Sequence, residues 1–202
     1  MIKKIKLYVL KTLIRVIKSF NRSKKLYEKK KLMSSFKSVG TGFKLSKDYV
    51  MINPQYVDIG NNFKFKSRFR LEAIDKYGSQ NFTPIVKIGN NVSFNYDVHI
   101  GCINQISIGD NCLFGSRILI TDHNHGEATK KSLNKAPEDR MLISKGNIVI
   151  GDNVWVGEGV AILAGVTIGK NSIVSANSVI TKNVPPNVMV GGVPAKIIKY
   201  ID

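Results

Sequence analysis

The feature that most constrains the fold is a six-residue repeat between Ile150 and Ile180. A period of six matches neither the roughly 3.6 residues of a helical turn nor the two-residue alternation of a free strand. It is typical of a strand that turns a corner every six residues, with one large side chain per flat face pointing into a three-sided core. The repeat therefore predicts a parallel β-helix. Its large apolar positions are Ile150, Val156, Ile162, Ile168, Val174 and Ile180.

Cassettes of isoleucine, glycine, any residue and asparagine extend this repeat over most of the chain. They begin at Ile59, Ile88, Ile108, Ile150 and Ile168. We therefore expect coils of about 18 to 20 residues with three faces each, about six of them stacked. The repeat is interrupted at 72–85 and 121–147, and we expect both segments to leave the coil as loops. A loop as long as the second is usually functional or disordered.

The N-terminal segment differs in charge from the rest of the chain. Residues 1–37 hold thirteen Lys or Arg and one acid, Glu28, so they carry +12 of the net charge of +17. This asymmetry indicates a basic arm rather than a basic domain. Residues 2–20 also show the spacing of an amphipathic helix, with lysines flanking one apolar stripe. The stripe consists of Ile2, Ile5, Val9, Leu13, Val16, Ile17 and Phe20.

Two interpretations of this helix stay open. It could cap the end of the β-helix, or it could lie on an anionic membrane surface, extended by the later lysines. No apolar run approaches the roughly 20 residues of a membrane span, and charges interrupt any secretory apolar region. No aromatic platform interleaves the charges, so nucleic acid is not the expected partner.

The two cysteines, Cys102 and Cys112, are too few for a disulfide framework. Cys112 falls on an inward small position and is expected to be a buried free thiol in a reducing compartment. We therefore expect a cytoplasmic protein, with peripheral contact at the inner face of the plasma membrane if the N-terminal helix binds lipid.

The last segments complete a resemblance. These are three segments near the end of the chain: Ser175-Ala176-Asn177-Ser178, Thr181-Lys182-Asn183-Val184-Pro185-Pro186 and Gly191-Gly192-Val193-Pro194-Ala195-Lys196. Over roughly residues 39 to 198 the chain resembles the hexapeptide-repeat acyltransferases, in the branch of the galactoside and maltose acetyltransferases. The resemblance implies a left-handed β-helix, a homotrimer and a coenzyme A thioester as donor.

The expected fold class is therefore all-β: a left-handed parallel β-helix with an N-terminal amphipathic α-helix and a short C-terminal helix. We expect three parts. Residues 1–36 form the basic helical arm, residues 37–187 form the acyltransferase domain with its loop at 121–147, and residues 188–202 form a C-terminal tail. Pro185-Pro186 is expected to stop the solenoid, and residues 194–201 to form the helix.

The stretch Thr121-Asp122-His123-Asn124-His125 ends a coil face and opens the long loop. His123 matches the position of the family's catalytic histidine, and the Asp-His-x-His form is closest to the branch that O-acetylates surface polysaccharides. A histidine suits the role of general base because its ordinary pKa lies near about 6.5. Asp122 and His125 are candidates to orient His123 or bind the acceptor. Adjacent strand residues point to opposite faces, so Asp122 is the weaker candidate unless the chain turns there.

Other site residues are expected from the same resemblance. Asn95 matches an asparagine that hydrogen-bonds the acceptor sugar; the alternative is that it satisfies a backbone group at a corner. The resemblance further implies that coenzyme A is held by Trp155, Ala176, Thr181, Lys182, Lys196 and Lys199.

These features predict an O-acetyltransferase that moves an acetyl group from acetyl-CoA directly to a sugar hydroxyl of capsule, lipopolysaccharide or a precursor. No metal is expected. An N-acyltransferase on an amino sugar, or a xenobiotic acetyltransferase of the same fold, is the alternative. A γ-type carbonic anhydrase would use three histidines around zinc, but His99, His123 and His125 have the wrong spacing. A scaffold without activity is a further alternative, because fold does not imply function.

Overall fold

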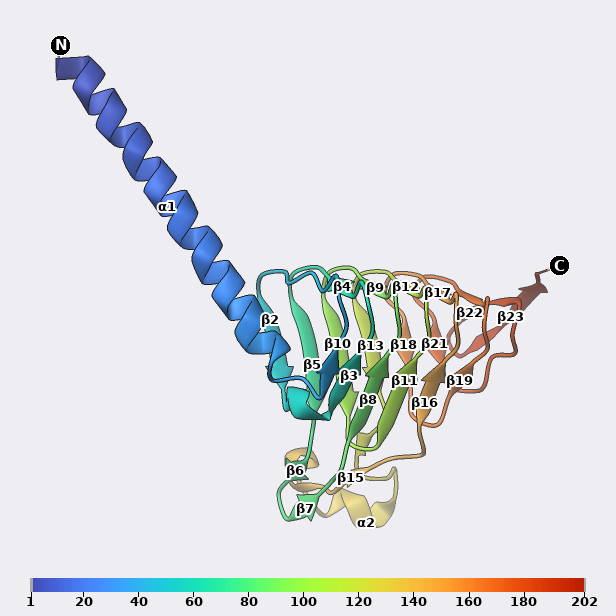
Figure 1. The fold of residues 1–202 in the computed structure, drawn as a ribbon. Coiled ribbons are helices and arrows are strands. Elements are labelled where there is room, and N and C mark those ends of the chain that lie inside the picture. Colours follow the sequence, from blue (N-terminus) through green and yellow to red (C-terminus); the bar gives the residue numbers. More distant parts are fainter. Residues whose placement is uncertain (1, 202) are drawn as a thin grey trace. The chain divides into compact units, whose positions relative to one another are not determined.

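The computed structural model describes residues 2–201, and it divides into two units, Met1–Ser35 and Phe36–Asp202. The first unit is a single helix, α1 (Ile2–Met33), longer than the predicted 2–20 (Figure 1). Leu13, Ile17 and Phe20 of the predicted stripe are all more than half exposed. The side chains of Ile2, Ile5 and Val9 lie outside the described residues. Among the residues described, no helix is long and apolar enough to cross a membrane.

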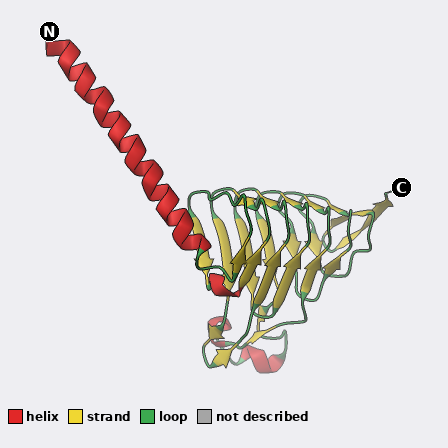
Figure 2. Cartoon of the chain, in the orientation of Figure 1, coloured by secondary structure: helices red, strands yellow, loops and turns green. Residues whose placement is uncertain are grey.

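The second unit is a β-helix whose three flat faces are parallel sheets (Figure 2). The first sheet holds β1 (Ser38–Val39), β3 (Val57–Ile59), β8 (Ile85–Ile88), β11 (Gln105–Ile108), β16 (Ile148–Ile150) and β19 (Thr167–Ile168). The second holds β2 (Tyr49–Ile52), β5 (Phe69–Ala73), β10 (Val98–Cys102), β13 (Ile118–Thr121), β18 (Ala161–Ile162) and β21 (Val179–Ile180). The third holds β4 (Lys64–Phe65), β9 (Ser93–Phe94), β12 (Leu113–Phe114), β17 (Trp155–Val156), β20 (Ile173–Val174), β22 (Val188–Gly192) and β23 (Ala195–Tyr200).

The predicted repeat positions form the core. All six apolar residues of the repeat between Ile150 and Ile180 are at most 1% exposed, and each lies on a different strand, three in one coil and three in the next. In the N-terminal coils phenylalanines fill the same space, and the rings of Phe94 and Phe114 stack at 4.3 Å. Both cysteines are buried and free, which confirms the prediction for Cys112. Burial raises the pKa of the Cys112 thiol to about 11.

The cassette asparagines form a ladder along one corner of the β-helix. Each has a left-handed backbone conformation with φ of 56° to 60°, which asparagine tolerates better than most residues. Each side-chain Nδ2 donates to Oδ1 of the next asparagine, at distances of 2.8 to 3.2 Å. The ladder contains Asn62, Asn91, Asn111, Asn153, Asn171 and Asn187.

Asn111 offers a direct test of this ladder. Asn111→Ala removes two side-chain hydrogen bonds and strains a left-handed corner, so we expect the free energy of unfolding to fall by about 2 kcal/mol. Asn111→Gly tolerates the backbone and loses the hydrogen bonds alone, so its loss should be about 1 kcal/mol. Urea unfolding measures both. Lys170→Ala, at the variable cassette position, is the control; equal stability of all four proteins would contradict a stabilising ladder.

Two excursions leave the β-helix where the repeat is interrupted, as predicted. The first carries the hairpin of β6 (Lys76–Tyr77) and β7 (Gln80–Asn81). The second carries β14 (Asn124–His125), α2 (Lys130–Leu133), a 3-10 turn (Pro137–Asp139) and β15 (Leu142–Ile143). A further 3-10 turn spans Pro54–Tyr56. The excursions lie side by side (Figure 1), because the Gln80 amide donates to Leu142 O at 3.0 Å and accepts from Leu142 N at 2.7 Å.

The predicted C-terminal helix is wrong. Residues 195–200 form β23, which pairs antiparallel with β22, and β22 itself continues the third sheet beyond Pro185-Pro186. A helix here would leave the backbone groups of β22 unpaired at the sheet edge. Ile197, Ile198 and Tyr200 also favour an extended chain. The two prolines therefore form a corner and do not stop the solenoid.

Candidate functional site

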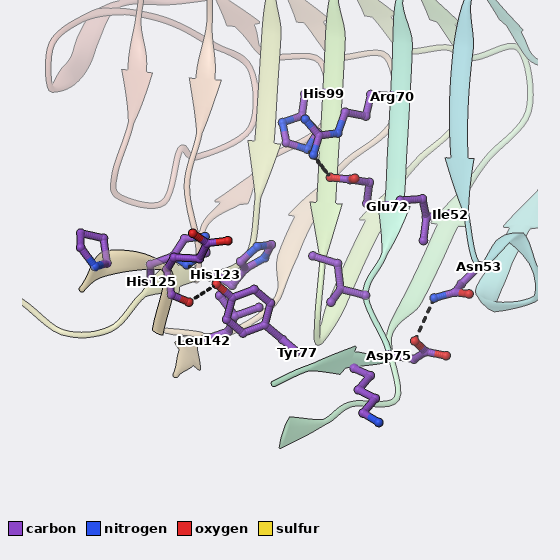
Figure 3. A pocket seen from close by; sticks show the side chains of 14 residues that line it. Ile52, Asn53, Arg70, Glu72, Asp75, Tyr77, His99, His123, His125 and Leu142 are labelled. Atoms are coloured by element: carbon purple, nitrogen blue, oxygen red, sulfur yellow. Dashed lines mark hydrogen bonds and ion pairs between the residues drawn. The ribbon is translucent and has the colours of Figure 1, made fainter. Parts of the chain in front are cut away.

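A groove of about 800 Å³ lies between the outer face of the second sheet and the two excursions (Figure 3). Its walls combine the ends of β2, β5 and β10 with the hairpin and the long excursion. The lining residues are Ile52, Asn53, Arg70, Glu72, Ile74, Asp75, Lys76, Tyr77, His99, His123, His125, Pro137, Glu138 and Leu142.

His123 enters this groove directly after β13. The chain bends at Asp122, whose side chain points inward and is fully buried, while the His123 side chain is 11% exposed. His123 Nδ1 lies 3.1 Å from Asp122 Oδ1. The weaker of the two predicted orienting residues is therefore the one in contact with His123, because the bend brings the adjacent side chains together.

Backbone hydrogen bonds hold the Asp122 carboxylate in place. Its Oδ1 accepts a hydrogen bond from Ile103 N at 2.9 Å, and its Oδ2 accepts one from Asn104 N at 2.8 Å. Both carboxylate oxygens of Asp122 therefore act as hydrogen-bond acceptors. His123 Nδ1 must then be the donor to Asp122. Its Nε2 carries the lone pair, and no described residue hydrogen-bonds to that atom.

Gly101 makes room for the imidazole. A Cβ at Gly101 would lie 3.1 Å from His123 Cε1, 3.6 Å from His99 Nε2 and 3.7 Å from Thr121 Oγ1. Because Gly101 faces outward between Glu72 of β5 and Thr121 of β13, its missing side chain leaves a gap in the sheet face. The His123 ring covers this gap, so the glycine sets how closely the ring approaches the sheet.

The sequence matches known families along its repeat. Residues 147–182 match the family described as bacterial transferase hexapeptide (six repeats), and residues 105–118 match the hexapeptide repeat of succinyl-transferase. Over 150 residues the chain is 37% identical to WbbJ of Escherichia coli (strain K12), a candidate lipopolysaccharide biosynthesis O-acetyl transferase. That alignment covers 73% of each protein. This chain belongs to the hexapeptide-repeat acetyltransferases.

Solved structures agree with this assignment. A maltose O-acetyltransferase from Clostridium difficile 630 is 27% identical with a TM-score of 0.58, over 85% of this chain and 73% of its own. A galactoside acetyltransferase in complex with coenzyme A is 26% identical with a TM-score of 0.57, over 85% of this chain and 68% of its own. The N-acyltransferase AntD from Bacillus cereus shares the fold at 21% identity, with a TM-score of 0.71 over 87% and 88% of the two chains.

His125 of this acetyltransferase also lines the groove, but it contacts Tyr77 of the hairpin. The Tyr77 hydroxyl lies 3.2 Å from His125 Nδ1 and donates to Glu138 O at 2.5 Å. Since the hydroxyl has one proton and the carbonyl needs it, His125 Nδ1 is the donor to Tyr77. His125 therefore also presents Nε2 as a lone pair, and it does not orient His123.

Arg70, Glu72 and His99 line the groove of the acetyltransferase, but the sequence analysis did not predict them as site residues. Arg70 and His99 both contact Glu72, whose Oε2 accepts from them at 2.7 and 3.0 Å. Burial lowers the pKa of His99, and the hydrogen bond to Glu72 opposes that shift only in part. The sequence contained a signal for this contact. The cassettes at Ile59 and Ile88 begin 29 residues apart, and Arg70 and His99 are separated by the same number, so they occupy equivalent positions on successive coils.

The other predicted site residues do not line this groove. Asn95 is half-buried after β9, where its backbone N donates to Phe114 O at 3.1 Å. All six predicted donor residues are exposed. Trp155, Lys196 and Lys199 lie on the third sheet, Ala176 lies at the corner after β20, and Thr181 and Lys182 lie at the corner after β21 of the second sheet. None of the six lines the groove that His123 enters. Among the described residues, no group of three His, Cys, Asp or Glu side chains could hold a metal ion.

Proposed function

We propose that this protein transfers the acetyl group of acetyl-CoA to a sugar hydroxyl of a surface polysaccharide, such as capsule or lipopolysaccharide, or of its precursor. The observation that carries the proposal is the His123–Asp122 pair. A buried carboxylate fixes one imidazole nitrogen and leaves the other open at a polar groove. The similarity to WbbJ, named for lipopolysaccharide O-acetylation, supports this acceptor class.

The proposed reaction is a direct transfer with His123 as general base. Nε2 takes the proton of the sugar hydroxyl while its oxygen attacks the thioester carbonyl. The tetrahedral intermediate then collapses, the bond to sulfur breaks, and the leaving thiolate takes the proton back from the imidazolium. Asp122 stabilises that imidazolium through Nδ1, since it is a buried carboxylate already held by two backbone donors. No covalent acyl-enzyme is required.

We place the donor on the six residues predicted from the resemblance, contributed by a second copy of the chain. The galactoside acetyltransferase of similar fold was solved in complex with coenzyme A, which supports the same donor here. Because none of the six lines the His123 groove of its own chain, we place the complete site between two neighbouring copies. The proposed assembly is a homotrimer, as the resemblance to the family implies.

Lys182→Ala tests the donor assignment. A lysine that contacts a coenzyme phosphate does so in ground and transition states alike, so we expect a KM for acetyl-CoA raised about 10-fold with kcat nearly unchanged. Steady-state kinetics at saturating acceptor measure both constants. Lys24→Ala on α1 removes the same charge elsewhere and should leave both unchanged. A large loss of kcat at constant KM would contradict this role of Lys182.

The proposed function is tested by mass spectrometry. Purified protein is incubated with acetyl-CoA and a panel of polysaccharides, methyl glycosides and amino sugars. A gain of one acetyl group on hydroxyl-only acceptors supports O-acetylation. Transfer confined to acceptors with a free amine would instead assign an N-acyltransferase, and no transfer to any carbohydrate would contradict the proposal.

We also propose that α1 binds anionic membrane surfaces at the inner face of the plasma membrane. Its exposed apolar side chains and lysines suit an interfacial helix, and each basic residue near the surface contributes about 1 kcal/mol. We expect co-sedimentation with phosphatidylserine vesicles that weakens as salt rises. A deletion should end at Ser35, because Phe36 already belongs to the β-helix unit, where its ring lies 5.9 Å from that of Phe43.

Two variants separate charge from apolar contact in this experiment. Deletion of residues 1–35 should abolish sedimentation, whereas replacing Ile17 and Phe20 by serine keeps every charge and should weaken it. If the deletion variant sediments as well as the full chain does, α1 has no part in membrane binding.

A further inference from the structure

Glu72 is a nearly buried carboxylate on the outward face of a sheet. It belongs to β5, alternates with the inward residues Leu71 and Ala73, and is nevertheless only 9% exposed. Arg70 Nη2 lies 2.7 Å and His99 Nε2 lies 3.0 Å from its Oε2 (Figure 3). We call these three residues the Glu72 cluster.

Stability of the fold does not explain this cluster. The Arg70 side chain is 53% exposed, and ion pairs of that kind contribute at most about 1 kcal/mol. Removing a carboxylate from water costs more than such a pair returns. On the adjacent strands, Ile52 pairs with Glu72 and Leu119 pairs with His99. Apolar residues therefore occupy neighbouring outward positions, and an apolar residue would suit the sheet face here.

One oxygen of Glu72 is left for a ligand. Both protein contacts use Oε2, and within residues 2–201 no hydrogen bond or ion pair uses Oε1. Among the described residues, the buried side-chain polar atom that lacks a hydrogen-bond partner is Ser175 Oγ. Glu72 Oε1 also lacks a partner but is not such a buried atom, so it is accessible at the protein surface. Since Glu72 lines the groove, Oε1 is open to whatever occupies it.

The position of Glu72 relates it to His123. In the ladder Glu72 pairs with Gly101, and the His123 ring covers the gap that Gly101 leaves. Glu72 and Gly101 are on adjacent strands, whose backbones lie ~4.8 Å apart, so the Glu72 side chain lies beside the gap that the imidazole covers. A sugar ring with its reacting hydroxyl at His123 Nε2 would present another hydroxyl to Glu72.

We propose that Glu72 Oε1 binds a second hydroxyl of the acceptor, so that the enzyme selects sugars by an uncharged hydroxyl beside the one that is acetylated. Arg70 and His99 are positioning residues, which hold the Glu72 carboxylate in place through Oε2. A carboxylate would repel an acidic group at that position of the sugar, so the hydroxyl is distinguished from a uronate. This inference rests on the proposed function and names the acceptor subsite.

Glu72→Gln tests the subsite with little change in shape. The amide oxygen stays toward the two donors, Arg70 and His99, so the amide NH₂ replaces Oε1 and a hydrogen-bond acceptor becomes a donor. Calorimetry with coenzyme A present measures the Kd of methyl glycosides of galactose, glucose, mannose, rhamnose and N-acetylglucosamine. We expect the Kd of each glycoside that binds to rise about 10- to 100-fold, as for loss of a hydrogen bond to a charged group.

Monodeoxy forms of the bound glycoside supply the decisive comparison. The form that lacks the Glu72-bound hydroxyl should bind wild type and Glu72→Gln equally, whereas the others should keep the difference. Glu28→Gln on α1 makes the same change of charge and should bind as wild type. Thermal unfolding of each variant verifies the fold.

Two results would overturn the subsite: Glu72→Gln binding every glycoside with the wild-type Kd, or wild type binding none of the panel. Acetyl transfer to the same glycosides is followed separately. Glu72-dependent binding without transfer would leave the subsite standing and contradict the proposed function alone.

Discussion

Replacing His123 by alanine is expected to lower kcat by about 10²- to 10⁴-fold while coenzyme A binding stays intact. The variant loses the only group that we assign to take the hydroxyl proton. The ring lies on the outer sheet face over Gly101 and is not part of the β-helix core, so we expect the variant to fold. Steady-state kinetics with saturating acetyl-CoA and the best glycoside, together with calorimetry of coenzyme A, separate turnover from binding.

His125→Ala is the matched comparison. It removes an imidazole from the same groove, but one that contacts Tyr77 and not His123, so its loss of kcat should be smaller. Near wild-type turnover in His123→Ala would contradict the mechanism. A larger loss in His125→Ala than in His123→Ala would move the base to His125.

Asp122→Asn is expected to lower kcat by at least about 10²-fold, because it changes the tautomer of His123. Asp122 accepts from Ile103 N, Asn104 N and His123 Nδ1. Ile103 N and His123 Nδ1 share Oδ1, whereas Asn104 N contacts Oδ2, so an asparagine oxygen keeps only one of the two backbone donors. When it keeps Asn104 N, the asparagine NH₂ takes the place of Oδ1 and faces Nδ1, which then has to accept. The proton moves to Nε2, and the base is lost. One backbone donor also loses its partner, so the free energy of unfolding should fall by about 1–3 kcal/mol.

Asp110→Asn separates the two effects. Asp110 accepts from Asn90 N at 2.6 Å in a corner away from the groove, and that backbone hydrogen bond lowers the pKa of its carboxyl. We expect this variant to lose stability without losing kcat. If Asp122→Asn lost only stability and kept wild-type kcat, Asp122 would be a structural residue with no part in catalysis.

The sequence predicts the β-helix well because its repeat is local. Each large residue such as Ile150 or Val156 points inward from one face, and each cassette asparagine occupies one corner. Six consecutive residues are therefore enough to predict which side chain is buried. The C-terminal segment shows the limit. Residues 195–200 are too short for periodicity to separate helix from strand, and the open edge of β22 decides the outcome.

The site was predicted in part. The position of His123, two residues after an inward residue, allowed its place in the groove to be predicted. The alternation of side chains along a strand disfavoured Asp122 as its partner, but a bend at Asp122 brings the two adjacent side chains together. The Glu72 cluster depends on register between coils separated by an excursion. The contact of Tyr77 with His125 joins two excursions 48 residues apart, and no local pattern encodes it.

The tautomer of His123 tests the account most directly. The chain contains three histidines, so ¹⁵N imidazole NMR of wild type and of the His99→Gln and His125→Gln variants assigns each ring. We predict Nδ1 protonated and Nε2 unprotonated in His123 at neutral pH, and the opposite tautomer in His99, whose Nε2 donates to Glu72. A His123 ring with its proton on Nε2 would contradict the assignment of Nε2 as the general base.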